Sequence, residues 1–178
     1  MESRIMIRKA TEDDAHAIWT IRDAAIQAQC RGAYASQVLD AWTGGELTEV
    51  FQAWVKSSFY VAVDGKSVAG SGAINLETGQ IDAVFVTPAL MGKGVGRMMM
   101  TFLENLAGEA GLKTTHLDST LNAAPFYRKC GYQGDEACLY QSLRGFSLDC
   151  VPMRKALTPP KAAAQHGGSP EAFGASDL

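Results

Sequence analysis

The residues most suggestive of chemistry form a glycine-rich turn at positions 91–97, with the sequence Met-Gly-Lys-Gly-Val-Gly-Arg. The turn follows an alternating apolar run that ends at Thr87-Pro88 and precedes a segment of helical period. Backbone N–H groups at the start of a helix attract anions, and glycines let a phosphate approach closely. Arg97 would oppose the helix dipole unless an anion lay between them. The turn therefore predicts a phosphate or pyrophosphate site.

Two common phosphate-binding motifs do not fit this turn. A P-loop would need Gly-Lys followed by Ser or Thr, and a Rossmann fingerprint has a different glycine spacing near the start of a βαβ unit. A purely structural alternative stays open, in which the glycines only allow a tight connection between strand and helix.

A second block, residues 122–132, reads Asn-Ala-Ala-Pro-Phe-Tyr-Arg-Lys-Cys-Gly-Tyr and follows a predicted strand. In this order, the two blocks resemble the motifs of the GCN5-related N-acetyltransferases. The family's acetyl-CoA motif, Q/R-x-x-G-x-G/A, corresponds to residues 91–96, and Met91 departs from the usual Gln or Arg. The family's segment, an Asn followed by F-Y-x-x-x-G-F/Y, corresponds to residues 122–132, where three residues separate Asn122 from Phe126. The resemblance covers residues 4–157, and the pattern Cys30-x-x-x-Tyr34 followed by Trp42 is similar to small bacterial members of unassigned substrate.

The resemblance implies transfer of an acetyl group from acetyl-CoA, a co-substrate, to a primary amine of a small molecule or protein, by direct attack in a ternary complex and without a metal. It implies that a backbone N–H near Phe85 or Val86 polarises the thioester carbonyl. The residues that it assigns to acetyl-CoA are Phe85, Val86, Met91, Gly92, Lys93, Gly94, Val95, Gly96, Arg97 and Asn122. A non-catalytic module that senses acyl-CoA is the alternative.

The reaction needs an acid and a base. Tyr127 is the predicted acid for the departing thiolate, although a Tyr beside Phe126 is also a common core residue. Asp82 is the predicted base because a carboxylate is unusual in the middle of a strand. Its rivals are Glu77, His116 and Asp118.

Three further polar residues have a structural alternative beside the functional one. Cys30 and Tyr34 are predicted to line the acceptor pocket, although a helical Cys is often a small core residue. Asn122 can bind near the pantetheine arm or cap the helix that follows it.

The elements that position these residues follow from periodicity. Strands are expected near residues 4–10, 58–63, 67–76, 80–86, 114–120, 136–143 and 147–157. Helices are expected from a capping box at Thr11 and Asp14 to about Cys30, and near residues 36–43, 47–54, 95–110 and 123–130. The first has the apolar face Ile18, Ile21, Ala25 and Ala28, and the fourth has the stripe Val95, Met99, Phe102, Leu103, Leu106 and Ala110.

These elements indicate an α/β (α+β) fold, and the resemblance implies a mixed, largely antiparallel sheet flanked by helices, with a splayed acetyl-CoA cleft. Residues 1–157 form the predicted acetyltransferase domain. Residues 158–178 hold three of the six prolines and few large apolar side chains, so we expect a disordered tail.

Composition narrows the class of protein. The 178 residues suit one domain, and a net charge of −3 with mixed signs gives no footprint for nucleic acid or an anionic membrane. No apolar run is long enough to span a bilayer, and no Cys or His spacing indicates a metal site. We expect a cytoplasmic protein with free thiols, in which Cys138 and Cys150 are buried strand residues, and a homodimer is left open.

Overall fold

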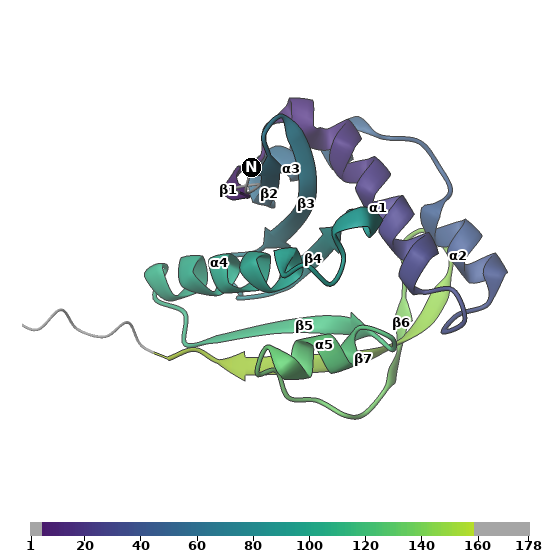
Figure 1. The fold of residues 1–178 in the computed structure, drawn as a ribbon. Coiled ribbons are helices and arrows are strands. Elements are labelled where there is room, and N and C mark those ends of the chain that lie inside the picture. The colour runs from purple at the N-terminus through teal and green to yellow at the C-terminus, as the bar shows by residue number, and fades with distance from the viewer. Residues whose placement is uncertain (1–4, 159–178) are drawn as a thin grey trace, which may run out of the picture.

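The computed structural model describes residues 5–158, which form two antiparallel sheets with helices around them (Figure 1). The first sheet has the order β1-β2-β3-β4 and the second the order β5-β7-β6. The strands are β1 (Met6–Lys9), β2 (Phe59–Asp64), β3 (Ser67–Ile74), β4 (Ile81–Val86), β5 (Thr114–Thr120), β6 (Cys138–Gln141) and β7 (Ser147–Ala156). The predicted tail from residue 159 onward lies outside the described residues.

The helices cover both faces of the first sheet. They are α1 (Ala15–Gln29), α2 (Ser36–Thr43), α3 (Glu49–Ser58), α4 (Val95–Glu109) and α5 (Ala124–Lys129), with the short 3-10 turns η1 (Glu12–Asp14) and η2 (Pro88–Leu90). Helix α4 packs on β3, β4 and β5, whereas α1 and α3 pack on the other face of β3. A side chain at Gly72 of β3 would collide with Met99 and Leu103, so this glycine allows α4 to lie close to the sheet.

The two sheets meet at one point. Gln80 and His116 form a single parallel bridge, in which the His116 N–H donates to the Gly79 carbonyl at 3.1 Å. Beyond this bridge β4 stays paired with β3, and β5 stays paired with β7 along its whole length. The facing edges of β4 and β5 therefore separate, and the splayed arrangement expected from the sequence is confirmed.

The helical stripes are largely as predicted, with two corrections. In α4 the buried set includes Met100 and Ala107, while Ala110 is exposed beyond the helix end. In α1, Ala28 is exposed and Ile26 is buried instead. The reason is that α2 covers a second side of α1, where Ile26 packs with Cys30 and Leu39.

The cysteine prediction was half wrong. Cys150 is buried in the central strand β7, but Cys138 is exposed. Strand β6 is the edge of the second sheet and all four of its residues are exposed, which the alternating sequence pattern could not reveal. The described part of the chain holds no group of three His, Cys, Asp or Glu side chains placed to share a metal ion. Within it, no helix has the length and apolar character needed to cross a bilayer.

The buried carboxylate of Asp14 anchors the start of α1. It accepts hydrogen bonds from both Arg8 Nη atoms at 2.7 and 2.9 Å and from the Thr11 N–H at 2.8 Å. The hydrogen bonds from Arg8 are the main cause that lowers the pKa of Asp14. This cluster ties β1 to the helix that leads into the cleft.

We predict that Asp14→Asn lowers the free energy of unfolding at pH 7 by about 1 to 3 kcal/mol, because it weakens a buried, charge-assisted network. Since the folded-state pKa is depressed, the wild-type advantage is complete above the unfolded pKa and shrinks as the pH falls below about 4. Urea unfolding at several pH values measures this difference. Asp13→Asn, at the exposed neighbour, is the control. An equal loss in both variants would contradict the anchoring role.

Candidate active site

The gap between β4 and β5 leads into two cavities that share a wall. The first, of about 600 Å³, lies between the glycine-rich loop, the end of α1 and α5. The second, of about 350 Å³, lies between α1, α3 and the hairpin of β6 and β7. Both are lined by Trp42, Ile81, Asp82, Ala83, Phe85, Asp118 and Thr120. The two cavities therefore adjoin along this wall.

The glycine-rich loop presents unpaired backbone donors to the first cavity. Gly92 and Gly94 adopt φ angles of +76° and +88°, and a Cβ atom added at either would meet nothing within 4 Å. The first hydrogen bond of α4 runs from the Met98 N–H to the Gly94 carbonyl, at 3.0 Å. Within the loop 91–97, the N–H groups of Gly92, Gly94, Val95, Gly96 and Arg97 find no acceptor among the described residues. This arrangement suits an anion.

The two cations predicted at the loop are placed differently. Arg97 lines the first cavity and donates to the Lys129 carbonyl at 3.3 Å. Lys93 is exposed and is not part of the cavity wall, whereas Met91 is. Only Arg97 is therefore held close to the space that a phosphate would enter.

Gly96 has a second role that the motif did not indicate. A Cβ atom at this position would lie 3.2 Å from Cζ of the Phe126 ring. The absence of a side chain therefore sets how closely α4 approaches α5.

The backbone of β4 supplies a donor at the shared wall. The Thr87 N–H donates to the Ala69 carbonyl of β3 at 2.9 Å, and the pairing continues with Phe85 opposite Ser71. Donors alternate between the two edges of an antiparallel strand, so the Phe85 N–H points to β3 and the Val86 N–H points to the open edge. Of the two predicted carbonyl-polarising groups, the register brings Val86 to the cleft.

Tyr127 lies on α5 and lines the first cavity. Its ring packs edge-on against Phe126 and Tyr132. Its hydroxyl has no hydrogen-bond partner in the part of the chain that the structure describes. Burial raises the pKa of Tyr127 well above its usual range, so the group stays protonated and can act as an acid.

Two of the four candidate bases reach the shared wall. Asp82 on β4 and Asp118 on β5 are exposed to the cleft and line both cavities. Burial is the main cause that raises the pKa of Asp82, and His116 opposes the shift while Asp118 adds to it. His116 lies beside them at the bridge, but Glu77 lies in the turn before β4 and lines neither cavity.

The remaining predicted residues divide between the cavity and the scaffold. Cys30 and Asn122 line the first cavity, and burial raises the pKa of the Cys30 thiol. Tyr34 lines neither cavity. Its hydroxyl donates to the Asp149 carbonyl at 2.6 Å and accepts from the Leu121 N–H at 2.9 Å. Tyr34 thus holds the connection after α1 against β5 and β7 and is not brought into the pocket predicted for it.

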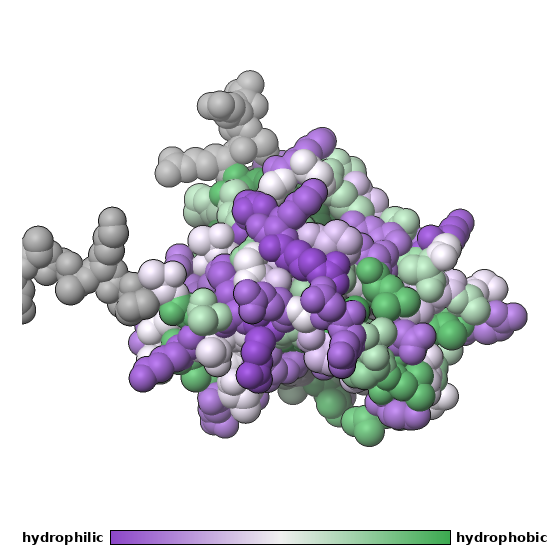
Figure 2. Space-filling model, turned by 90° about the horizontal axis from the view of Figure 1, so that it is seen from below, coloured by the Kyte–Doolittle hydropathy of each residue, from purple (hydrophilic) through white to green (hydrophobic). Residues whose placement is uncertain are grey.

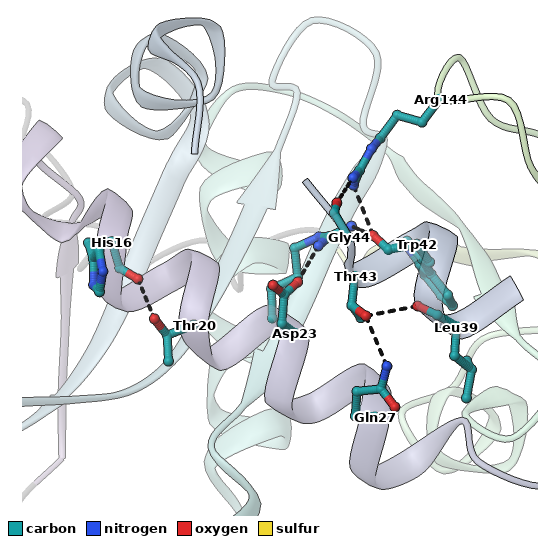
Figure 3. Close-up of polar contacts among 10 residues, drawn as sticks. His16, Thr20, Asp23, Gln27, Leu39, Trp42, Thr43, Gly44 and Arg144 are labelled. Carbon is teal, nitrogen blue, oxygen red and sulfur yellow. Dashed lines mark hydrogen bonds and ion pairs between the residues drawn. The ribbon is translucent and has the colours of Figure 1, made fainter. Parts of the chain in front are cut away.

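The second cavity contains a set of residues that no local motif indicates. Its wall is rich in aromatic side chains, namely Trp42, Phe51, Trp54, Phe59, Phe85, Tyr140 and Phe146. Arg22 and Arg144 also line it, and both donate to the Trp42 carbonyl at the end of α2, at 2.8 and 2.9 Å. Figure 3 shows Arg144 reaching the end of α2, where Gln27 also contacts Thr43. Six separate segments of the chain build the wall of this cavity, so only the tertiary structure reveals it.

Comparison with known proteins agrees with this geometry. Residues 55–134 match the sequence model described as an acetyltransferase (GNAT) domain. An uncharacterized N-acetyltransferase of Bacillus subtilis, YjcF, is 30% identical over 80 residues, which cover 44% of this chain and 57% of that protein. The chain thus aligns with little more than half of that relative.

Solved structures extend the likeness over the described fold. A GCN5-related N-acetyltransferase from Rhodopseudomonas palustris superposes with a TM-score of 0.80 at 26% identity, covering 88% of this chain and 98% of that one. The PaiA N-acetyltransferase of Thermoplasma acidophilum, solved with coenzyme A, has a TM-score of 0.69 at 16% identity, covering 86% and 99%. Residues 55–134 thus match an acetyltransferase (GNAT) domain, and the described fold is that of the GCN5-related N-acetyltransferases.

Proposed function

We propose that the protein transfers the acetyl group of acetyl-CoA to the primary amine of a small molecule, by direct attack in a ternary complex. The observation that carries this proposal is the separation of β4 from β5. Around this gap lie the free N–H groups of the glycine loop, a protonated Tyr127 and the carboxylates of Asp82 and Asp118. The cytoplasmic location and the homodimer stay predictions of the sequence.

The first cavity would bind the acetyl donor, acetyl-CoA. The free N–H groups of the loop, with Arg97, would hold the pyrophosphate of acetyl-CoA. The Val86 N–H at the open edge of β4 would donate to the thioester oxygen as negative charge develops there. The solved PaiA protein carries coenzyme A, which supports the same cofactor for this fold.

Side chains that line the two cavities could carry out the two proton transfers of the reaction. An alkylamine with a pKa near 10.4 is mostly protonated at neutral pH, so a base must remove one proton before attack. Asp82, with Asp118 beside it, would take this proton directly or through water. Tyr127 would protonate the CoA thiolate as the tetrahedral intermediate collapses.

The second cavity narrows the class of acceptor. About 350 Å³ with seven aromatic side chains in its wall suits a small amine with a flat apolar body, whose ammonium would lie near Asp82 and Asp118. Arg22 and Arg144 also line this cavity, and both are hydrogen-bonded to the Trp42 carbonyl. This shape favours a small molecule over the protein substrate that the sequence left open.

The test is acceptor-dependent release of CoA, with the mass of the product confirmed. We expect arylalkylamines such as phenethylamine to accelerate release more than polyamines of similar size, because only the former fit the aromatic wall. Trp54→Ala should reduce this preference, since Trp54 lines the acceptor cavity only. Tight CoA binding without release for any amine would instead support the sensor alternative.

Tyr127→Phe tests the acid. Because the ring is kept, CoA affinity should survive, whereas loss of a positioned general acid costs about 10² to 10⁴ in kcat. The defect should shrink with an acyl donor whose thiol leaves more easily.

Tyr132→Phe is the matched control for that variant. The Tyr132 hydroxyl is 2.7 Å from Thr115 Oγ1 in the core, so its removal should lower stability and leave the rate per folded molecule intact. A Tyr127→Phe enzyme with the wild-type rate would show that another group protonates the thiolate.

Gly94→Ala tests the loop. The substitution forces an L residue into a φ of +88°, at a cost of about 1 to 2 kcal/mol, and adds a methyl group near the space that a phosphate would occupy. Isothermal titration with CoA should show weaker binding.

Gly111→Ala is its control, because Gly111 has a φ of +84° and equally open surroundings at the far end of α4. It should lose similar stability but keep CoA affinity. Equal CoA affinity in the two variants would mean that the glycine loop is purely structural.

A further inference from the structure

Two cysteine thiols lie side by side on the hairpin that covers the acceptor cavity. Cys138 of β6 is directly opposite Cys150 of β7, and their Sγ atoms are 3.6 Å apart. Both are free thiols. Neither has a part in the transfer chemistry proposed above.

The strand register allows these thiols to be joined. The Ser142 N–H donates to the Phe146 carbonyl at 2.9 Å, so residues 142 and 146 form a hydrogen-bonded pair at the turn. Such pairs alternate along an antiparallel ladder, which makes Cys138 and Cys150 a hydrogen-bonded pair with Cα atoms about 5.5 Å apart. Disulfides span Cα distances of about 4.4 to 6.8 Å, so a disulfide between these residues can form without rearrangement of the backbone.

The two thiols differ in access. Cys138 is exposed at the sheet edge, whereas Cys150 is 3% exposed. Burial raises the pKa of Cys150 to about 12, and the neighbouring Cys138 thiol adds to the shift. Cys138 is therefore the thiol that a reagent in solution reaches first, and Cys150 is the one that closes the bond from within.

The cysteine pair lies beside the acceptor cavity and away from the cavity proposed for acetyl-CoA. Cys150 lines the acceptor cavity, opposite Thr120 of β5, and is absent from the wall of the first cavity. At the tip of the same hairpin, Arg144 is bonded to the end of α2. The face seen in Figure 2 has apolar side chains gathered at the end that carries α2 and this hairpin, where Leu139, Tyr140 and Leu143 are exposed.

We propose that Cys138 and Cys150 form a reversible redox pair that small disulfides oxidise to a cross-strand disulfide, and that this bond alters the acceptor cavity. The Cys138 thiolate attacks one sulfur of a disulfide such as oxidised glutathione and expels one thiolate. Cys150 then loses its proton and attacks Cys138 Sγ, expelling the second. The two protons lost by the cysteines are taken up by the two thiolates released.

The experiment uses the full chain equilibrated in glutathione buffers of increasing oxidised fraction, quenched with acid, alkylated and digested. We expect a peptide pair joined through Cys138 and Cys150 that carries no alkyl label and is about 2 Da lighter than the two unlabelled peptides together. Dithiothreitol should return it to two peptides that both take the label. Cys30 and Cys130 should stay alkylated throughout. Full alkylation of Cys138 and Cys150 in the most oxidising buffer, or glutathione left attached to Cys138 without closure, would overturn the proposal.

Variants separate the pair from its neighbours. Cys138→Ser should abolish the linked peptide, and Cys150→Ala should trap glutathione on Cys138. Cys130→Ser, at a half-buried cysteine outside the hairpin, should leave the linkage unchanged.

The effect on the cavity rests on the proposed function and is measured separately. We expect oxidation to change KM for the amine several-fold, while the Kd for CoA stays within about a factor of two. An unchanged KM in a fully linked sample would overturn the claim about the cavity. If no amine is acetylated in either redox state, the proposed function fails, whereas the mass result still decides the thiol pair.

Discussion

The single bridge between Gln80 and His116 determines where the two sheets part and the cleft begins. A sheet gains hydrogen bonds by pairing all its strands, yet β4 and β5 stay together for only this one bridge and then separate. Their facing edges leave backbone donors and acceptors that water or a ligand must satisfy. An extended molecule with amide groups, such as the arm of coenzyme A, can do so like an added strand.

The same separation creates different surroundings on its two sides. Toward α4 and α5 the gap is lined by backbone N–H groups and Arg97, which favour an anion. Toward α3 and the β6–β7 hairpin it is lined by aromatic rings, which favour an apolar body. Asp82 and Asp118 lie between them, at the height where the strands part. A single opening thus has two sides of different chemical character.

Features of the fold and the site could be predicted from the sequence where residues close together in the chain determine them. The strand over residues 114–120 and the glycine loop have their signals within a few residues, and the structure places them as predicted. The exposure of Cys138 depends on β6 being an edge strand, and the position of Tyr34 depends on carbonyl and N–H groups about 90 to 115 residues away. Similarly, Arg144 reaches α2 across about 100 residues of sequence. Contacts between residues so far apart in the sequence produce no local pattern from which they could be predicted.

The contact between Gly96 and Phe126 links the glycine loop to α5, the two elements that acetyl-CoA would contact together in the proposed reaction. The loop would hold its phosphates, and α5 carries Tyr127, the next residue after Phe126. Since a methyl group at Gly96 would lie 3.2 Å from the ring, the spacing between these two ends is determined by the space that one hydrogen atom occupies. This fixed spacing would select a donor by the length of the arm between its phosphates and its thioester. A thioester with a shorter arm could fill the phosphate site or reach the tyrosine, but not both.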